Sequence, residues 1–260
     1  MAMLRFDDEG AKLTERLYAS PDVVAQRDTV LARLAPRPGE RVLDVGSGPG
    51  YLLESIARAV GASGAAHGLD PSRAMNELAT ARTRELPWVR LDEGEATALP
   101  YPNDAFDAAV STQVYEYVPD VPGALAELRR VLRPGGRVLI LDTDADSLVW
   151  HTADRARHRR ILDAWDKHLA HPRLPRILPA LLRRAGFRVT GHHVHPILNL
   201  ELTPDSFSAT QMHIIADFVP GHGGVTEADA EAWLADLRER ADRGEYFYCL
   251  NRYLFTAETE

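Results

Sequence analysis

The chain has 260 residues and a formal net charge of −8, with 45% hydrophobic and 26% charged residues. This composition is typical of a soluble globular protein, and the acidic balance argues against a general binder of nucleic-acid phosphates. A single cysteine, Cys249, excludes an internal disulfide and a thiolate metal cluster, and we expect no metal site.

The start of the chain is acidic and lacks the apolar core of a signal peptide. No apolar run approaches the roughly 20 residues that a membrane span requires. We therefore expect a cytoplasmic protein, a monomer or a homodimer, that has no nucleic-acid or membrane partner.

Helices and strands alternate along most of the chain. Apolar periodicity predicts, in order, a helix over 21–35, a strand over 41–45, a helix over 52–60, a strand over 65–69, a helix whose first turn holds Pro71, strands over 88–91 and 105–111, a helix over 121–132 and a strand over 137–141. Such alternation predicts right-handed crossovers and a mainly parallel sheet that is covered on both faces.

The last part of the chain departs from this rhythm. We expect residues 154–186 to be helical, 187–195 to form a strand, and 203–244 to form two helices before a final strand over 246–257. The inserted helices would form a lid or substrate wall near the mouth of the sheet. Their apolar side chains suggest an apolar or aromatic substrate: Phe207, Met212, Ile214, Ile215, Phe218 and Trp233.

The first strand runs into a glycine-rich turn, Gly46 to Gly50, which is followed by a helix. In an open parallel sheet, ligands bind beyond the carboxyl ends of the strands, and glycines let a ligand approach the main chain. Asp70 ends the next strand, where a carboxylate accepts hydrogen bonds from two ribose hydroxyls. The turn and Asp70 together indicate a nucleoside site.

Two kinds of cofactor compete for this site. A dinucleotide site has the pattern Gly-x-Gly-x-x-Gly, whereas this chain has Gly-x-Gly-x-Gly followed by Tyr51. Asp44, directly before the turn, would repel a pyrophosphate but attract an ammonium, directly or through water. A ligand with a ribose and an amino-acid end suits both features.

Several motifs in order resemble those of class I S-adenosylmethionine-dependent methyltransferases, closest to the ubiquinone/menaquinone C-methyltransferase-like branch. The resemblance spans about residues 20–142 and rests on 42–50 (VLDVGSGPG), 68–72 (GLDPS), 94–100 (GEATALP), 106–110 (FDAAV), 114–120 (VYEYVPD) and 132–136 (LRPGG). It implies a Rossmann-like, seven-stranded, mainly parallel sheet with an antiparallel last strand, and S-adenosyl-L-methionine as the cofactor.

The resemblance also implies a set of cofactor-binding residues. Asp70 would bind the ribose, Glu95 and the backbone of Ala96 would hold the adenine, and Arg27 would pair with the cofactor carboxylate from a covering helix. Relatives mostly carry Asp where this chain has Glu95, and a surface arginine is an equal alternative for Arg27. The full expected set is Arg27, Asp44, Gly46, Ser47, Gly48, Gly50, Asp70, Pro71, Met75, Gly94, Glu95, Ala96, Gln113, Val114 and Tyr117.

The expected chemistry is an in-line displacement at the sulfonium methyl, for which a base is needed only when the nucleophile starts protonated. His151, after the fifth main strand, and His213, on the inserted helices, are the candidate catalytic bases. Each also has the simpler reading of a hydrogen-bonding surface histidine.

The sequence thus predicts one methyltransferase domain over 1–260, with an N-terminal helical cover (1–40), a Rossmann-like core (41–200), a lid insertion (203–244) and a final strand (246–257). The predicted reaction is C-, O- or N-methylation of a small, apolar or aromatic molecule. A nicotinamide (NAD)-dependent oxidoreductase and a non-catalytic cofactor-binding module remain as alternatives.

Overall fold

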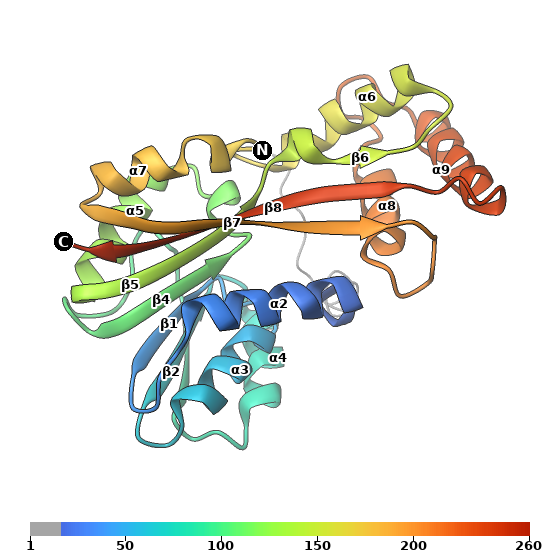
Figure 1. Cartoon of the computed structure of the whole chain (residues 1–260). Coiled ribbons are helices and arrows are strands. Elements are labelled where there is room, and N and C mark those ends of the chain that lie inside the picture. Colours follow the sequence, from blue (N-terminus) through green and yellow to red (C-terminus); the bar gives the residue numbers. More distant parts are fainter. Residues whose placement is uncertain (1–16) are drawn as a thin grey trace.

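The computed structural model describes residues 17–260, so the acidic start of the chain and the first part of the expected helical cover lie outside the described residues. Strands and helices alternate as expected (Figure 1). The strands are β1 (Arg41–Val45), β2 (Ala65–Asp70), β3 (Val89–Glu93), β4 (Phe106–Thr112), β5 (Leu132–Thr143), β6 (Val149–Trp150), β7 (Phe187–Asn199) and β8 (Tyr248–Thr259). The α-helices are α2 (Pro21–Leu34), α3 (Tyr51–Val60), α4 (Arg73–Thr83), α5 (Val121–Val131), α6 (Arg155–Trp165), α7 (Leu178–Arg184), α8 (Phe207–Phe218) and α9 (Glu227–Asp242).

The strands form one mixed sheet in the order β3-β2-β1-β4-β5-β8, with β7 also paired to β8. Strands β1 to β5 pair in parallel, and β8 runs antiparallel to both β5 and β7. The predicted Rossmann-like sheet with an antiparallel last strand is therefore confirmed. The two-residue β6, which pairs with the start of β8, is an addition that the sequence did not indicate.

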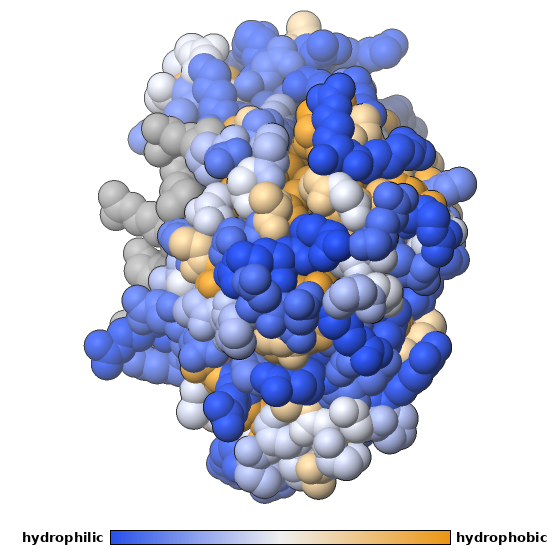
Figure 2. Space-filling view, turned by 90° about the vertical axis from the view of Figure 1, so that its left-hand side faces the viewer, coloured by the Kyte–Doolittle hydropathy of each residue, from blue (hydrophilic) through white to orange (hydrophobic). Residues whose placement is uncertain are grey.

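Helices cover both faces of the sheet. Alternate residues of β5 point to opposite faces, so Leu139 packs with α2 and α3, whereas Val138 and Ile140 pack with α5 and α7. On the face at the left of Figure 1, where α7 and the C-terminus lie, hydrophilic side chains dominate and hydrophobic ones show only in small areas (Figure 2). The apolar side chains thus lie mainly in the layers between helices and sheet.

Beyond the carboxyl ends of the parallel strands, β7 and β8 continue into a second body of helices (Figure 1). We call this body the helical lobe; it consists of α6, α8 and α9 with β6 and the adjoining halves of β7 and β8. Its apolar side chains form a cluster separate from the two on the sheet faces. Two helices between the last two strands were predicted, and α8 and α9 confirm them.

The prediction that residues 154–186 are helical is confirmed for α6 and α7, but the segment is broken between these two helices. Pro172 and Pro175 lie in the break, and Pro179 occupies the start of α7. Proline has no N–H to donate within a helix, and its ring clashes with the preceding turn. The break sends α6 into the helical lobe and returns α7 to the sheet.

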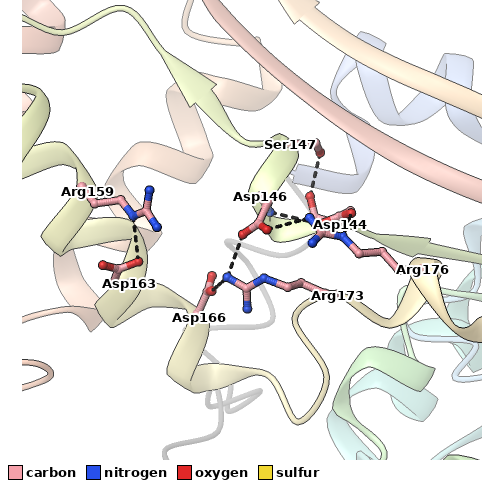
Figure 3. A network of polar contacts seen from close by, with 8 residues as sticks. All are labelled: Asp144, Asp146, Ser147, Arg159, Asp163, Asp166, Arg173 and Arg176. Carbon is pink, nitrogen blue, oxygen red and sulfur yellow. Dashed lines mark hydrogen bonds and ion pairs between the residues drawn. The ribbon is translucent and has the colours of Figure 1, made fainter.

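The break is held by a network of ion pairs beside the loop that follows β5 (Figure 3). Arg176 contacts both oxygens of Asp144 at 2.7 and 3.0 Å and also Asp146 at 2.6 Å. Arg173 lies between Asp146 and Asp166, at 2.7 and 3.1 Å. These contacts fix the connection between the helical lobe and α7 relative to the end of β5.

The side chains that suggested an apolar substrate occupy the interior of the lobe. Four of them, Phe207, Met212, Ile215 and Trp233, are each 2% exposed or less. All four belong to the apolar cluster of the lobe. Their hydrophobicity is explained by the stability of the lobe itself. It therefore gives no information about the polarity of a substrate.

Candidate functional site

The glycine turn after β1 has the conformation that its residues demand. Gly46, Gly48 and Gly50 have φ of +72°, +52° and +81°, a region that other residues rarely adopt. A Cβ on Gly46 would lie 2.2 Å from the side chain of Val114, and one on Gly50 would lie 2.9 Å from the Cα of Ala79. Glycine at these two positions is therefore required by close packing within the protein.

Gly48 differs from its two neighbours because a Cβ there would meet no atom closer than ordinary van der Waals contact. The nearest atom to a Cβ there is the Tyr18 hydroxyl, at 3.8 Å. The backbone N–H of Gly48 donates to Asp70 Oδ2 at 2.9 Å, and Ser72 N–H donates to Asp70 Oδ1 at 2.9 Å. These bonds fix the Asp70 carboxylate beside the turn, with further lone pairs on each oxygen for a ligand.

Asp44 is buried directly beneath the turn, with 1% of its surface exposed. Its Oδ2 and the Ser47 hydroxyl make no hydrogen bond, although both atoms are buried. Burial, and secondarily the charge of Asp70, raises the pKa of Asp44 to about 8. The group is thus mainly protonated at neutral pH, rather than the free carboxylate that the sequence suggested, and a ligand ammonium would favour its ionised form.

Helix α2 and Tyr18, three residues before its start, cover the turn. Tyr18, Gln26 and Arg27 line a narrow cavity whose other walls include Asp44 and Ser47. Arg27 donates to the Tyr18 carbonyl at 3.3 Å, and its guanidinium lies 4.9 Å from the centre of the Tyr51 ring. The structure therefore places Arg27 in the wall of the cavity rather than on an open helix surface.

Other expected cofactor residues lie at the same end of the sheet. Gly94 N–H donates to the Asp70 carbonyl at 3.4 Å, the charge of Glu95 contributes to raising the pKa of Asp70, and Ala96 is buried beside them. Met75 is buried on α4. Pro71 does not start that helix as expected: Ser72 is the N-cap, its hydroxyl accepting from Met75 N–H, and the helix begins at Arg73.

The segment after β4 also reaches this end of the sheet. Gln113 has φ of +58°, and its side chain donates to the Thr143 hydroxyl at 2.7 Å. Val114 follows and packs over Gly46. Tyr117 is half-buried, and its ring lies 5.8 Å from that of His168, which places it between the sheet and the helical lobe.

The two candidate bases lie elsewhere. His151 is exposed at the outer side of the lobe, where its Nδ1 lies 2.9 Å from the Glu245 carbonyl. His213 is an exposed residue of α8. Neither lines the cavity above the turn. The structure thus does not bring either histidine together with the expected cofactor residues.

A buried polar cluster that the sequence analysis missed lies at the ends of β4, β5 and β8. Glu116 Oε2 accepts from Thr143 N–H at 2.9 Å, and Asp142 Oδ1 accepts from Val114 N–H at 3.2 Å. Burial raises the pKa of Asp142 well above its usual range and that of Glu116 to about 7. Arg252 of β8, 3% exposed, acts on Glu116 through its charge.

One signal could have revealed this cluster. Tyr248, Leu250, Arg252 and Leu254 are alternate residues of the last strand, so they share one face. An arginine in phase with three large apolar residues predicts a buried guanidinium, which calls for a specific partner.

Comparison with known proteins agrees with this site. A family model described as a methyltransferase domain matches residues 21–192. The chain belongs to this methyltransferase family. A 2-phytyl-1,4-naphtoquinone methyltransferase of Synechococcus elongatus is 43% identical to the chain over 114 residues. The match covers 42% of the chain and 48% of that protein. The chain spans about half the length of the first curated relatives it matches.

Solved structures share the fold at low identity. A phosphoethanolamine N-methyltransferase 2 of Haemonchus contortus, in complex with S-adenosyl-L-methionine, has a TM-score of 0.63 at 20% identity, covering 98% of the chain and 57% of that protein. The [4+2]-cyclase SpnF has a TM-score of 0.59 at 24% identity, covering 91% and 80%. Because these two names denote different reactions, the fold alone does not decide which reaction this methyltransferase-family protein performs.

The described residues were also searched for two other kinds of site. Across 17–260, no helix combines the length and apolar character needed to cross a membrane. The same part of the chain contains no group of three or more His, Cys, Asp or Glu residues arranged to hold a metal ion.

Proposed function

We propose that this protein transfers a methyl group from S-adenosyl-L-methionine to a small molecule. The observation that carries the proposal is the pair of acids at the glycine turn: the Asp70 carboxylate, fixed beside Gly48, and the unpaired Asp44 Oδ2 beneath the turn. These two acids match the two polar ends of the cofactor, a ribose diol and an amino-acid ammonium. The residues present therefore fit this cofactor.

Each wall of the site has a role in binding. Asp70 accepts hydrogen bonds from the ribose, Glu95 and Ala96 hold the adenine, Asp44 faces the ammonium, and Arg27 pairs with the carboxylate. When bound, the cofactor supplies a sulfonium methyl that an acceptor lone pair takes in line, while the electrons of the broken C–S bond remain on sulfur. Helix α2 excludes water from the turn that it covers.

The acceptor lies, in this proposal, between the cofactor and the helical lobe, which serves as its wall. We assign no base to His151 or His213, because neither lines the cavity. The expected setting, a cytoplasmic monomer or homodimer without a nucleic-acid partner, is part of the same proposal.

The proposal is tested by calorimetric titration with S-adenosylhomocysteine, the demethylated cofactor, and separately with NADH. We expect the first to bind and the second not to bind. Asp70→Asn keeps the side-chain shape but removes a charge-assisted acceptor, and should weaken binding by about 1.5–3 kcal/mol, or roughly 10- to 150-fold. Asp217→Asn, an exposed change on α8, serves as the matched control.

Four results would count against the proposal. Absence of binding near micromolar concentrations removes the cofactor, and unchanged affinity in Asp70→Asn removes Asp70 from the site. Tight binding of NADH would instead support the oxidoreductase alternative. Binding of the cofactor without turnover on any of a broad set of acceptors would leave a non-catalytic binding module.

A further inference from the structure

Arg252 is a buried cation at the joint between the sheet and the helical lobe. Its backbone lies beside Thr143, at the carboxyl end of β5, on one side and beside His195 of β7 on the other. Its side chain is 3% exposed and faces α2 and α8, where it contacts Gln26 and Phe207. The guanidinium thus lies at the end of the sheet where ligands of this fold bind.

The contacts of this guanidinium leave it incompletely satisfied. Arg252 donates one hydrogen bond, from Nη1 to the amide oxygen of Gln26, and its Nε is buried without a partner. The ring of Phe207 lies 4.8 Å from its central carbon. Within residues 17–260, no carboxylate forms an ion pair with it at 4.0 Å or less. A buried charge in this state is costly, so its presence calls for an explanation other than stability.

The protein's own acids do not fill this role. Glu116 interacts with Arg252 through its charge, but its Oε2 is bonded to the Thr143 backbone and no atom of it reaches the guanidinium within ion-pair distance. Asp142 is directed to the backbone of Val114. The only acceptor on Arg252 in the described chain is a neutral amide, from a residue that lines the cofactor cavity.

Tyr18 connects this cation with the cofactor end. It lies within electrostatic reach of Asp44 and Asp70 on one side and of Arg252 and Glu116 on the other. Its hydroxyl is also the nearest atom above Gly48. A molecule held by Arg252 would therefore lie next to the proposed cofactor and beside Phe207 of the helical lobe, whose ring contacts the guanidinium.

We propose that Arg252 binds an anionic oxygen of the methyl acceptor, which takes the place of the Gln26 amide. This inference rests on the proposed function and adds a substrate class to it: a small molecule that carries a carboxylate, enolate or phenolate. Guanidinium groups prefer such oxygens because they form charge-assisted, bidentate hydrogen bonds with them. An acceptor that binds already ionised needs no histidine base, which agrees with the positions of His151 and His213.

The test compares an anion with its neutral isostere on the full chain saturated with S-adenosylhomocysteine. The probes are 4-fluorobenzoate and 4-fluorobenzamide, and binding is measured by fluorine NMR titration. We expect the wild type to bind the benzoate at least about tenfold more tightly, the lower end of what a charge-assisted bond contributes. Arg252→Gln should abolish this preference, and Arg252→Lys should retain part of it.

A second variant tests the same contact from the other side. Gln26→Glu places a built-in carboxylate where Gln26 now accepts from Arg252, and so should also abolish the preference for benzoate. Gln26→Met, which removes the amide but adds no charge, is its matched control and should keep the preference. Both variants leave Arg252 in place, so they remain informative if Arg252→Gln fails to fold.

A further NMR measurement is made on the wild type itself, and a variant is needed only to assign one signal. The ¹⁵N–¹H signal of Arg252 Nε, assigned by its loss in Arg252→Lys, should shift with 4-fluorobenzoate and stay in place with 4-fluorobenzamide. Equal binding of the two probes, no binding of the benzoate, or an unmoved Nε signal overturns the inference.

The cofactor titration separates this inference from the proposed function. A tenfold loss of S-adenosylhomocysteine affinity in Arg252→Lys would assign Arg252 to the cofactor's carboxylate instead, which also overturns the inference. If the wild type does not bind S-adenosylhomocysteine at all, the proposed function itself fails.

Discussion

The proposed cofactor site, which is the glycine turn 46–50 with Asp44 and Asp70, and the helical lobe are held together by different kinds of contact. At the cofactor end, backbone N–H groups and short side chains carry the structure, as in the bonds from Gly48 and Ser72 to Asp70. In the lobe, large aromatic rings do so: Trp150 and Trp233 pack edge to face with centres 5.3 Å apart. The first arrangement leaves buried polar atoms unpaired at Asp44 and Ser47; the lobe also has two such atoms, Thr152 Oγ1 and Arg240 Nε, but its large rings pack into one apolar cluster. We therefore expect the lobe cluster to contribute mainly stability, and recognition to occur where the lobe meets the sheet.

The largest effect that would break this comparison is expected from Trp233→Ala. The Trp233 ring is 1% exposed and donates to His158 Nδ1 at 3.1 Å, so its removal should cost about 3–5 kcal/mol of unfolding free energy. Denaturant unfolding measures this loss, with Trp233→Phe as a milder control. At a temperature where the variant remains folded, its affinity for S-adenosylhomocysteine should match that of the wild type; a parallel loss would show that the two regions are not separable.

Gly50→Ala, in the glycine turn, should lower the free energy of unfolding by a similar or smaller amount. The new Cβ would lie 2.9 Å from the Cα of Ala79, and the alanine would have to adopt a φ near +81°. Together these two effects should cost about 2–5 kcal/mol. Gly244→Ala is the matched control, because Gly244 also has positive φ, lies in the left-handed turn that ends α9 (Glu245 N–H donates to the Arg240 carbonyl) and has nothing within 4 Å of a Cβ; it should cost only about 1–2 kcal/mol. Thermal and denaturant unfolding compare the two, and equal losses would contradict the close packing at Gly50.

The last expected effect concerns the charge of Asp44, and it is graded with pH, so it is small only within any one pH unit. Its pKa is about 8 in the folded chain and about 4 when unfolded, so the wild type should lose stability as the pH rises between these values, by at most about 1.4 kcal/mol per pH unit. Asp44→Asn cannot ionise, so its stability advantage should grow from about pH 5 to about pH 8. Melting temperatures measured across this range, with Asp28→Asn as an exposed control, would refute the prediction if the wild-type and Asp44→Asn curves ran parallel.

The sequence predicted the structure correctly where the local backbone conformation permits only one or a few residue types. Gly46 and Gly50 had to be glycines because of close packing, and Asp70 is the last residue of the second strand, so the turn and the sheet topology were predicted correctly. The family resemblance supplied the rest of the expected cofactor set, whose binding roles stay predictions.

Contacts between distant segments could not be predicted in this way. Arg252 meets Gln26 across 226 positions of sequence, and no spacing rule links an arginine in the last strand to a glutamine in the first described helix. The apolar residues of α8 were assigned to a substrate because their partners in α6 and β6 were not known. His151 was chosen for its position after a strand and His213 for its place on the inserted helices, and neither position fixes the direction in which the side chain points.

The continuous pairing of β7 with β8 has a consequence for how molecules enter and leave. The ladder runs from Phe187 and Thr259 in the sheet to Asn199 and Tyr248 in the helical lobe. Swinging the lobe aside would bend this two-stranded arm, so we expect the lobe to act as a fixed wall rather than a hinged lid. A ligand of the glycine turn would then enter and leave where α2 lies over the turn. We therefore expect the detachment of that helix to limit the rate at which the ligand exchanges.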